Sequence, residues 1–420
     1  MKIRVRRRWK WPLENVLFFI AMFCVVTYAL LEHVSIPIPE YSAVKFPLVY
    51  LGGICILTQV GRIFRVLMKR KYFYVVLALV AFCLSVFLST YFNKSPTIGV
   101  DPTTYTTRLL LYVVELFLLM IWISETGRSK SAINFIFYYL LIVTAVTDLL
   151  MLTGLVTFET GGYTNYLVGT KFIVVYFHFN LLAIWLVRNR DRMVSEKTSK
   201  AIAVWGIAVI VFIAIYVDCM TGILGCLLML LMLGFLRSPK RKRIVKLHSS
   251  GLMQTVVATT VIFPFVAGLL LSLPPVQHIL LNTFNRSENL TGRLNIYTEF
   301  MEGMSKHWLW GYGVGNANTV SVRMFGYANA QNALLQWILQ IGVPGTALMV
   351  GLMSVILSRL SRSGAVVRST PLVCLVYMYI VMGMIEITYS MSFFLWFALI
   401  FMLSAENPPE MTEQPAVDGT

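Results

Sequence analysis

The sequence predicts an all-α protein that crosses a membrane many times. Hydrophobic residues make up 58% of the chain and charged residues only 13%, whereas a soluble domain carries about 25% charged residues. Several apolar runs reach the roughly 18 residues that a helix needs to cross lipid. The Lys and Arg residues fall in short segments between these runs. Since lipid offers no hydrogen-bond partners, each run is expected to form a helix that satisfies its own backbone.

Twelve such helices are expected. They lie near residues 13–31, 41–60, 72–92, 105–123, 131–151, 170–187, 201–217, 221–236, 252–272, 330–357, 371–387 and 391–404.

An even number of spans puts both chain ends on one side of the membrane, and the charges indicate which side. The segments on the side of the N-terminus carry 27 of the 35 Lys and Arg residues. Because positively charged loops stay in the cytoplasm, both termini are expected there, in a bacterial inner membrane.

The loops on the opposite side are short with one exception, residues 273–329. This loop is rich in Trp, Tyr, Gly and Asn, which is not the composition of a disordered segment, so we expect it to fold over the membrane surface. The expected parts are a bundle of about nine helices over residues 1–272, this external loop, further helices over 330–404 and a cytoplasmic tail over 405–420.

Composition also argues against other classes of site. A net charge of +16 is compatible with nucleic-acid binding, but charges confined to loops between apolar runs are typical of membrane topology. The six cysteines lie in or beside apolar segments without a CxxC pair, so no disulfide framework is expected. We expect no metal, no other cofactor and no nucleic-acid partner.

Ionisable side chains inside lipid are costly, so each is a candidate functional residue. The fourth expected span places polar groups on one helical face. They are Tyr105, Arg108, Tyr112 and Glu115. The alternative for each is a buried ion pair or hydrogen bond that only orders the bundle.

Other expected spans carry isolated polar groups. Lys171 and His178 share a face of the sixth span, and Asp148 lies near the outer end of the fifth. Glu386 lies near the outer end of the eleventh. For His178 we favour a hydrogen-bonded core histidine over a functional role.

The tenth expected span carries an amide stripe, formed by Asn329, Asn332, Gln336 and Gln340. In lipid this stripe must face the bundle or a wet cavity. Helix packing through the amides is the alternative.

The external loop and its exit carry the most specific pattern. They read LTGRLNIY at 290–297, WLWGYGVGN at 308–316, ANAQNALLQ at 328–336 and IGVPG at 341–345. This order resembles the O-antigen ligase and polymerase family, the Wzy/WaaL-type membrane glycosyltransferases. That family shows Gly-Arg, a glycine-rich turn ending in Asn, a His-Asn pair opening the next helix, then Leu-Gln and Gly-x-x-Gly. The resemblance implies a GT-C-like layout of about twelve helices with one large external loop.

Two positions depart from the family pattern. Gln331 stands where the family has the histidine that is often assigned as the base, and glutamine cannot take up a proton at neutral pH. Met220 stands where an arginine would follow Asp218.

The resemblance implies a donor glycan on undecaprenyl diphosphate and a sugar hydroxyl as acceptor. Arg293 occupies the Gly-Arg position, and we expect it to bind the diphosphate together with Arg108 and Arg323, because guanidinium groups match phosphate oxygens. For Arg323, simple solvation in the loop is the alternative.

For catalysis we expect Glu386 as the base, because a carboxylate near the membrane boundary can have a raised pKa. Gln331 and Asn332 are expected to bind sugar or phosphate. The other candidate bases are His307, Asp218 and Glu299.

Three aromatic residues of the loop, Trp308, Trp310 and Tyr312, offer apolar faces to sugar rings. Aromatic anchors at the membrane interface are the equal alternative.

The function predicted from these observations is metal-independent polymerisation of lipid-linked repeat units for capsule, exopolysaccharide or O-antigen. The partners are the lipid-linked donor and acceptor and the bilayer, with a flippase and a chain-length regulator as candidates. An O-antigen ligase or a flippase are the alternatives. A flippase often shows duplicated halves, and no duplication is evident here. A structural scaffold gives no reason for carboxylates in lipid.

Overall fold

The structure is a computed structural model that describes residues 12–32, 41–93, 101–155, 157–160, 163–189, 196–236, 246–271, 273–276, 278 and 293–406. Its helices are α1 (Leu13–Leu30), α2 (Tyr41–Leu57), α3 (Val60–Leu67), α4 (Arg70–Phe92), α5 (Pro102–Glu125), α6 (Ser129–Leu152), α7 (Lys171–Asn189), α8 (Glu196–Tyr216), α9 (Met220–Leu236), α11 (Ser250–Leu271), α13 (Arg293–Met304), α14 (Ala317–Phe325), α15 (Ala333–Arg362), α16 (Val366–Met382) and α17 (Met391–Ala405). A small antiparallel sheet lies between α6 and α7, formed by β1 (Phe158–Thr160), β2 (Tyr163–Tyr166) and β3 (Gly169–Thr170).

Each of the twelve predicted spans overlaps a helix. In the described part of the chain, six helices are long and apolar enough to cross a membrane, namely α1, α4, α5, α6, α7 and α15. The pair α2 and α3 is a seventh candidate, bent by 72°. Five further apolar helices, α8, α9, α11, α16 and α17, extend over 10–17 described residues. The chain is an all-α polytopic membrane protein, as predicted, whereas the number of twelve spans stays a prediction.

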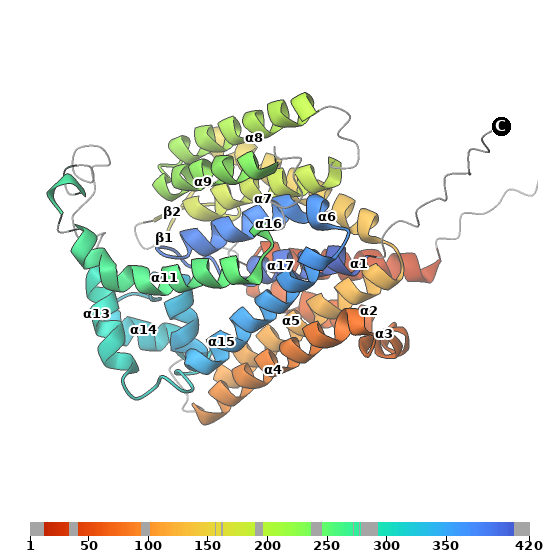
Figure 1. Cartoon of the computed structure of the whole chain (residues 1–420), viewed down its shortest axis with the longest axis horizontal. Coiled ribbons are helices and arrows are strands. Elements are labelled where there is room, and N and C mark those ends of the chain that lie inside the picture. The colour runs from red at the N-terminus through yellow and green to blue at the C-terminus, as the bar shows by residue number, and fades with distance from the viewer. Residues whose placement is uncertain are drawn as a thin grey trace, which may run out of the picture.

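The centre of the bundle is α17, a helix that is apolar on every side and therefore suited to complete burial. All of its side chains except Ser392 are buried. It contacts α1, α5, α15 and α16, and Figure 1 shows it surrounded by them.

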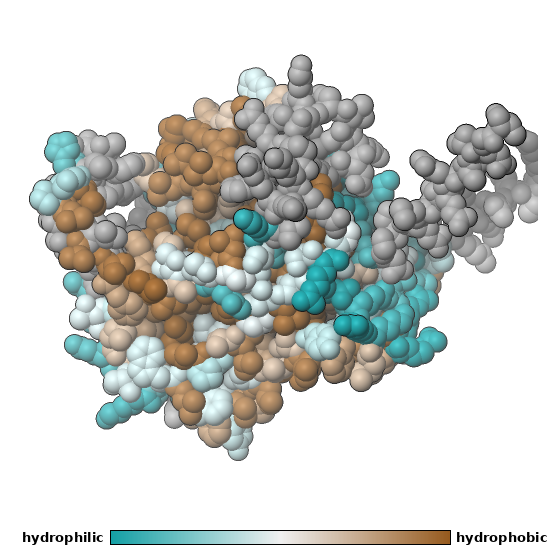
Figure 2. Space-filling model, in the orientation of Figure 1, coloured by the Kyte–Doolittle hydropathy of each residue, from teal (hydrophilic) through white to brown (hydrophobic). Residues whose placement is uncertain are grey.

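The two ends of the bundle differ in charge. At the end where α3 lies, Glu125 pairs with Lys69 at 2.9 Å and with Lys71 at 2.6 Å, and Glu14 pairs with Arg62 at 2.8 Å. We call this the α3 end. Figure 2 shows hydrophilic surface gathered there and hydrophobic surface over much of the rest of this face.

The opposite end carries α13 and α14 and is called the α13 end (Figure 1). These helices form a small core of their own with the first part of α15, in which Phe300, Phe325 and Leu339 are buried. The part of the predicted external loop over residues 293–329 is therefore folded, and it contains two helices that the sequence analysis did not place. Residues 277 and 279–292 of that loop lie outside the described residues. The sheet of β1 to β3 was also not predicted.

A break divides α15 into residues 333–341 and 343–362, because Gly342 has φ 71° and ψ 178°. The carbonyls released at the break accept hydrogen bonds from the loop: Tyr312 N donates to Leu339 O at 2.8 Å, and Gly313 N donates to Gln340 O at 2.9 Å. A Cβ on Gly342 would collide with the backbone of Leu309. The glycine-rich loop thus fits into the broken helix.

Candidate active site

The turn between α16 and α17, residues 383–390, carries Glu386 at the α13 end. Glu386 N donates to Met382 O at 3.1 Å, and Thr388 Oγ1 donates to Tyr379 O at 2.6 Å. A Cβ on Gly383 would lie 2.8 Å from Thr388 Oγ1, so this close turn depends on glycine. Glu386 therefore lies beyond the end of α16 and not on a membrane span as predicted.

Asn332 joins this turn to two helices. As the N-cap of α15 it accepts hydrogen bonds from Leu334 N and Leu335 N, both at 3.0 Å. Its Nδ2 donates to Thr260 O of α11 at 3.2 Å and to Met384 O at 3.1 Å. These four bonds use the capacity of a side-chain amide, and the residue is fully buried. Asn332 consequently positions the backbone of the site.

Gln331 precedes this cap in a strained conformation, with φ 51°. Left-handed backbone is rare for residues other than glycine and is often found at functional sites. Its N and its Nε2 both donate to Asn329 Oδ1, at 3.0 and 2.9 Å. The half-buried Gln331 is thus held beside the turn that carries Glu386, since Ala333 N donates to Gly383 O at 2.8 Å.

Glu386 interacts electrostatically with residues from two other elements, Tyr176 of α7 and Cys219. Cys219 lies between α8 and α9. Burial raises the pKa of its thiol to about 11, with the negative charge of Glu386 adding to the shift and Lys171 opposing it. A thiol in this state is protonated at neutral pH and is not a nucleophile.

The lysine that acts on Cys219 also belongs to this site. Lys171, the first residue of α7, donates through Nζ to Asp218 O at 2.7 Å and pairs with Asp218 Oδ2 at 3.3 Å. Asp218 has φ 51°. Lys171 therefore lies beside the segment where the family arginine is replaced by Met220. The sequence analysis placed it on one face of the sixth expected span with His178 but gave it no role in phosphate binding.

The predicted arginines do not gather at one place. Arg108 stacks on Phe46, with its guanidinium carbon 3.4 Å from the ring centroid, in a different cluster from Gln331 and Glu386. Arg323 is exposed on α14. Arg293 begins α13, and its side chain lies outside the described part of the structure.

The three predicted glycan-binding aromatics are half-buried and pack against the protein. Trp308 contacts Phe300 edge to face at 6.1 Å, and Trp310 lies 4.8 Å from Phe92 of α4. The Tyr312 ring stacks on His307 at 4.0 Å. Each ring thus helps to hold the loop against α4 or α13.

Two intramembrane groups lie away from this site. His178 has both ring nitrogens within hydrogen-bond distance of an oxygen, Asp148 Oδ2 at 3.1 Å and Val174 O at 2.9 Å, as expected of a core histidine. Glu115 is buried, and neither carboxyl oxygen has a hydrogen-bond partner among the described residues. It lies over α2, where a Cβ on Gly53 would be 2.5 Å from its Oε1.

Residues 205–350 match the family model of the O-antigen ligases, Wzy_C. This segment is similar to the O-antigen ligases and covers the glycine-rich loop and the first part of α15. No curated protein matches the chain. The resemblance to the O-antigen ligase and polymerase family that the loop predicts is confirmed by this match. The matched segment contains Asp218, Gln331 and Asn332, whereas Lys171 and Glu386 lie outside it. Lys171 is joined to the segment by its hydrogen bond to Asp218 O, and the turn of Glu386 by the bond from Ala333 N to Gly383 O.

Proposed function

We propose that the chain polymerises undecaprenyl-diphosphate-linked oligosaccharide units for capsule, exopolysaccharide or O-antigen. The observation that carries this proposal is that a carboxylate, a cation and a strained amide, those of Glu386, Lys171 and Gln331, all lie at the α13 end, with Glu386 and Lys171 both acting on Cys219. Such a set can deprotonate a hydroxyl, hold a phosphate and bind a sugar.

The α13 end is the outer face in this proposal, and both termini are cytoplasmic. The ion-paired basic segments at the α3 end support this orientation, because cytoplasmic loops carry the excess of Lys and Arg. The donor lipid would then present its diphosphate at the level of Lys171.

The reaction breaks the bond between the anomeric carbon of the donor and the diphosphate oxygen. The acceptor hydroxyl oxygen forms the new glycosidic bond, its proton passes to Glu386, and the lipid diphosphate leaves with the bonding electrons. Lys171 stabilises this leaving group together with Arg293, which the family pattern assigns to it. Gln331 donates or accepts a hydrogen bond to a sugar hydroxyl but takes no proton.

Ligation of finished polymer is the second candidate, because the matched family model is described as O-antigen ligase. Polymerisation is preferred because Gln331 replaces the histidine of the family pattern. The two reactions differ in the acceptor, so the length and attachment of the glycan separate them.

The test is glycan length in a strain whose only copy carries Glu386→Gln, with membrane abundance checked. We expect single repeat units that are still exported and attached, because the acceptor hydroxyl has lost its base. Glu302→Gln, on the exposed face of α13, is the matched control and should leave long chains.

Long polymer accumulating on its lipid carrier in Glu386→Gln would instead identify a ligase. Unchanged glycan length and attachment would remove Glu386 from the mechanism. The same assay in purified form tests metal independence, since chain growth in EDTA should equal growth without it.

A further inference from the structure

The short helix α3 turns away from the direction of the bundle at the α3 end (Figure 1). Its axis is bent by 72° from that of α2. Since α2 packs along α1, which is long and apolar enough to cross a membrane, a helix at this angle runs closer to the membrane plane than to the membrane normal. The surroundings of α3 therefore decide whether it lies in lipid, in water or at the boundary.

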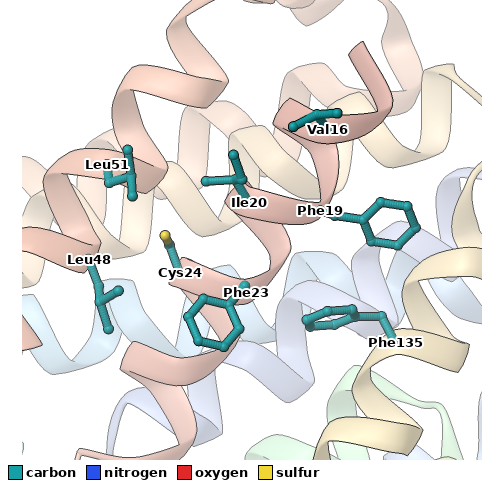
Figure 3. Close-up of a pocket in the computed structure, with 8 residues that line it drawn as sticks. All are labelled: Val16, Phe19, Ile20, Phe23, Cys24, Leu48, Leu51 and Phe135. Carbon is teal, nitrogen blue, oxygen red and sulfur yellow. The ribbon is translucent and has the colours of Figure 1, made fainter. Parts of the chain in front are cut away.

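The outer surface of the bundle is apolar up to the junction of α2 and α3. A groove between α1, α2 and α6 is lined by apolar side chains, among them Phe19, Leu48 and Leu51 (Figure 3). Beyond the groove, Ile54 and Leu57 of α2 are exposed. A continuous apolar surface of this kind is stable against acyl chains and not against water. We therefore expect the hydrocarbon of the bilayer to reach the start of α3.

The side chains of α3 form three faces, about a third of a turn apart. Ile63 and Val66 are buried against the bundle. Val60 and Phe64 lie one turn apart on a second face, and Met68, directly after the helix, continues it. Phe64 is 66% exposed and Met68 is 74% exposed. This second face is therefore an apolar stripe that the described part of the protein leaves uncovered.

The third face is basic. Arg62 and Arg65 are exposed on it, and Arg70 is exposed at the start of α4. Arg62 is paired with Glu14 at 2.8 Å. Among the residues that the structure describes, no carboxylate pairs with Arg65 or Arg70. Arg65 Nε donates to Gly61 O at 3.0 Å, which leaves the terminal nitrogens of its guanidinium for an outside acceptor.

We propose that α3 is an interfacial helix that binds anionic phospholipid headgroups in the leaflet at the α3 end. Exposed Phe64 and Met68 argue against water as the surroundings, and the arginines argue against hydrocarbon. Only the boundary between acyl chains and headgroups satisfies both faces. There the apolar stripe lies among acyl chains, and Arg65 and Arg70 contact lipid phosphates, which guanidinium groups match in shape and charge.

The angle between the two exposed faces favours lipid over a protein partner. The apolar stripe and the basic face point about a third of a turn apart, so one flat partner surface would contact only one of them. A phospholipid layer presents acyl chains and phosphates at neighbouring depths and surrounds both faces. The proposal does not depend on the reaction at the α13 end.

The first experiment compares two neighbouring positions of the full-length protein, Phe64→Cys and Arg65→Cys. In isolated membranes opened by freezing and thawing, a membrane-impermeant maleimide should modify Arg65→Cys about tenfold faster or more, because a thiol among acyl chains forms little thiolate. Both variants should react equally after unfolding in SDS. The wild type measures the background of the native cysteines, of which five are buried and Cys83 is half-buried.

The second experiment tests the headgroup. Native mass spectrometry of the full-length protein, in an equimolar mixture of phosphatidylglycerol and phosphatidylcholine, should show preferential binding of phosphatidylglycerol. Arg65→Gln with Arg70→Gln should lower this preference about tenfold or more, because each arginine near an anionic surface contributes about fivefold in affinity. Arg65→Lys with Arg70→Lys keeps the charges and should retain the preference. Lys246→Gln, exposed before α11, is the control and should change little.

Three results would overturn the proposal. Equal modification of Phe64→Cys and Arg65→Cys in membranes would place α3 in water. An unchanged preference for phosphatidylglycerol in the double glutamine variant would remove the headgroup from the basic face. Protection of Phe64→Cys that appears only after the soluble cell fraction is added back would assign the apolar stripe to a protein partner.

Discussion

At the scale of single residues, the site depends on side chains that hold the backbone as much as on those that face a substrate. Asn332 and Gln331 are neighbours in the family pattern, but the structure gives them different tasks. Asn332 is buried with all its hydrogen bonds made inside the protein, while Gln331 is half-buried in a strained conformation. In the proposed mechanism, contact with the substrate is therefore assigned to Gln331 and not to Asn332.

Replacing Asn332 tests the positioning role. Asn332→Ala removes the cap of α15 and two donated bonds to buried carbonyls, so the free energy of unfolding should fall by about 3 kcal/mol. The measurement is denaturant unfolding of the purified protein in detergent. Asn295→Ala, exposed on α13, is the control and should change little. An unshifted midpoint for Asn332→Ala would show that the cap is dispensable.

Lys171 is a site residue whose role could not be predicted from residue types alone. Its charge was visible in the sequence, but its role was not, because Asp218 and Cys219 lie far from it along the chain. The sequence feature that could have predicted this role is the position of Lys171 at the edge of an apolar run, because a cation there lies outside the lipid core. Conversely, Arg108 fits a phosphate site by type, and the structure places it in a separate cluster.

At the scale of elements, the break in α15 decides how the external segment is attached. A straight helix would keep the carbonyls of Leu339 and Gln340 for its own bonds, and the loop would lose its partners. Trp308 O also accepts a hydrogen bond from Val343 N, at 2.8 Å. The Gly-x-Gly segment and the Ile-Gly-Val-Pro-Gly segment are thus held together by backbone hydrogen bonds at the break in α15.

Gly342→Ala should disrupt this contact. A side chain at φ 71° and ψ 178°, a region used almost only by glycine, costs about 1–3 kcal/mol, and the Cβ would also displace the backbone of Leu309. We expect lower stability in detergent and faster protease cleavage within residues 308–316.

Gly351→Ala is the matched control in the same helix. It has open space around its Cβ and should be neutral or stabilising by up to about 1 kcal/mol. If the two variants behave alike, the break does not hold the loop.

At the scale of the whole molecule, the bundle has a basic end with ion pairs and an opposite end with the folded loop and the candidate site. This polarity predicts the orientation of the protein in the membrane. In intact cells, a membrane-impermeant maleimide should label Glu302→Cys but not Lys69→Cys. Both positions should react after permeabilisation, because both are accessible at the surface. The reverse pattern would place the candidate site in the cytoplasm.

The sequence by itself determined the class of the molecule, the positions of its apolar helices and the family of its loop. These are local properties, because a segment in lipid must satisfy its own backbone, whichever helices surround it. The tertiary structure alone decided that α17 is central and that α15 breaks at Gly342. It also decided that Lys171 pairs with Asp218 and that both lie at the same end as Gln331 and Glu386. Which side chains come into contact depends on how the surfaces of several helices pack together. The periodicity of a single helix does not predict that packing.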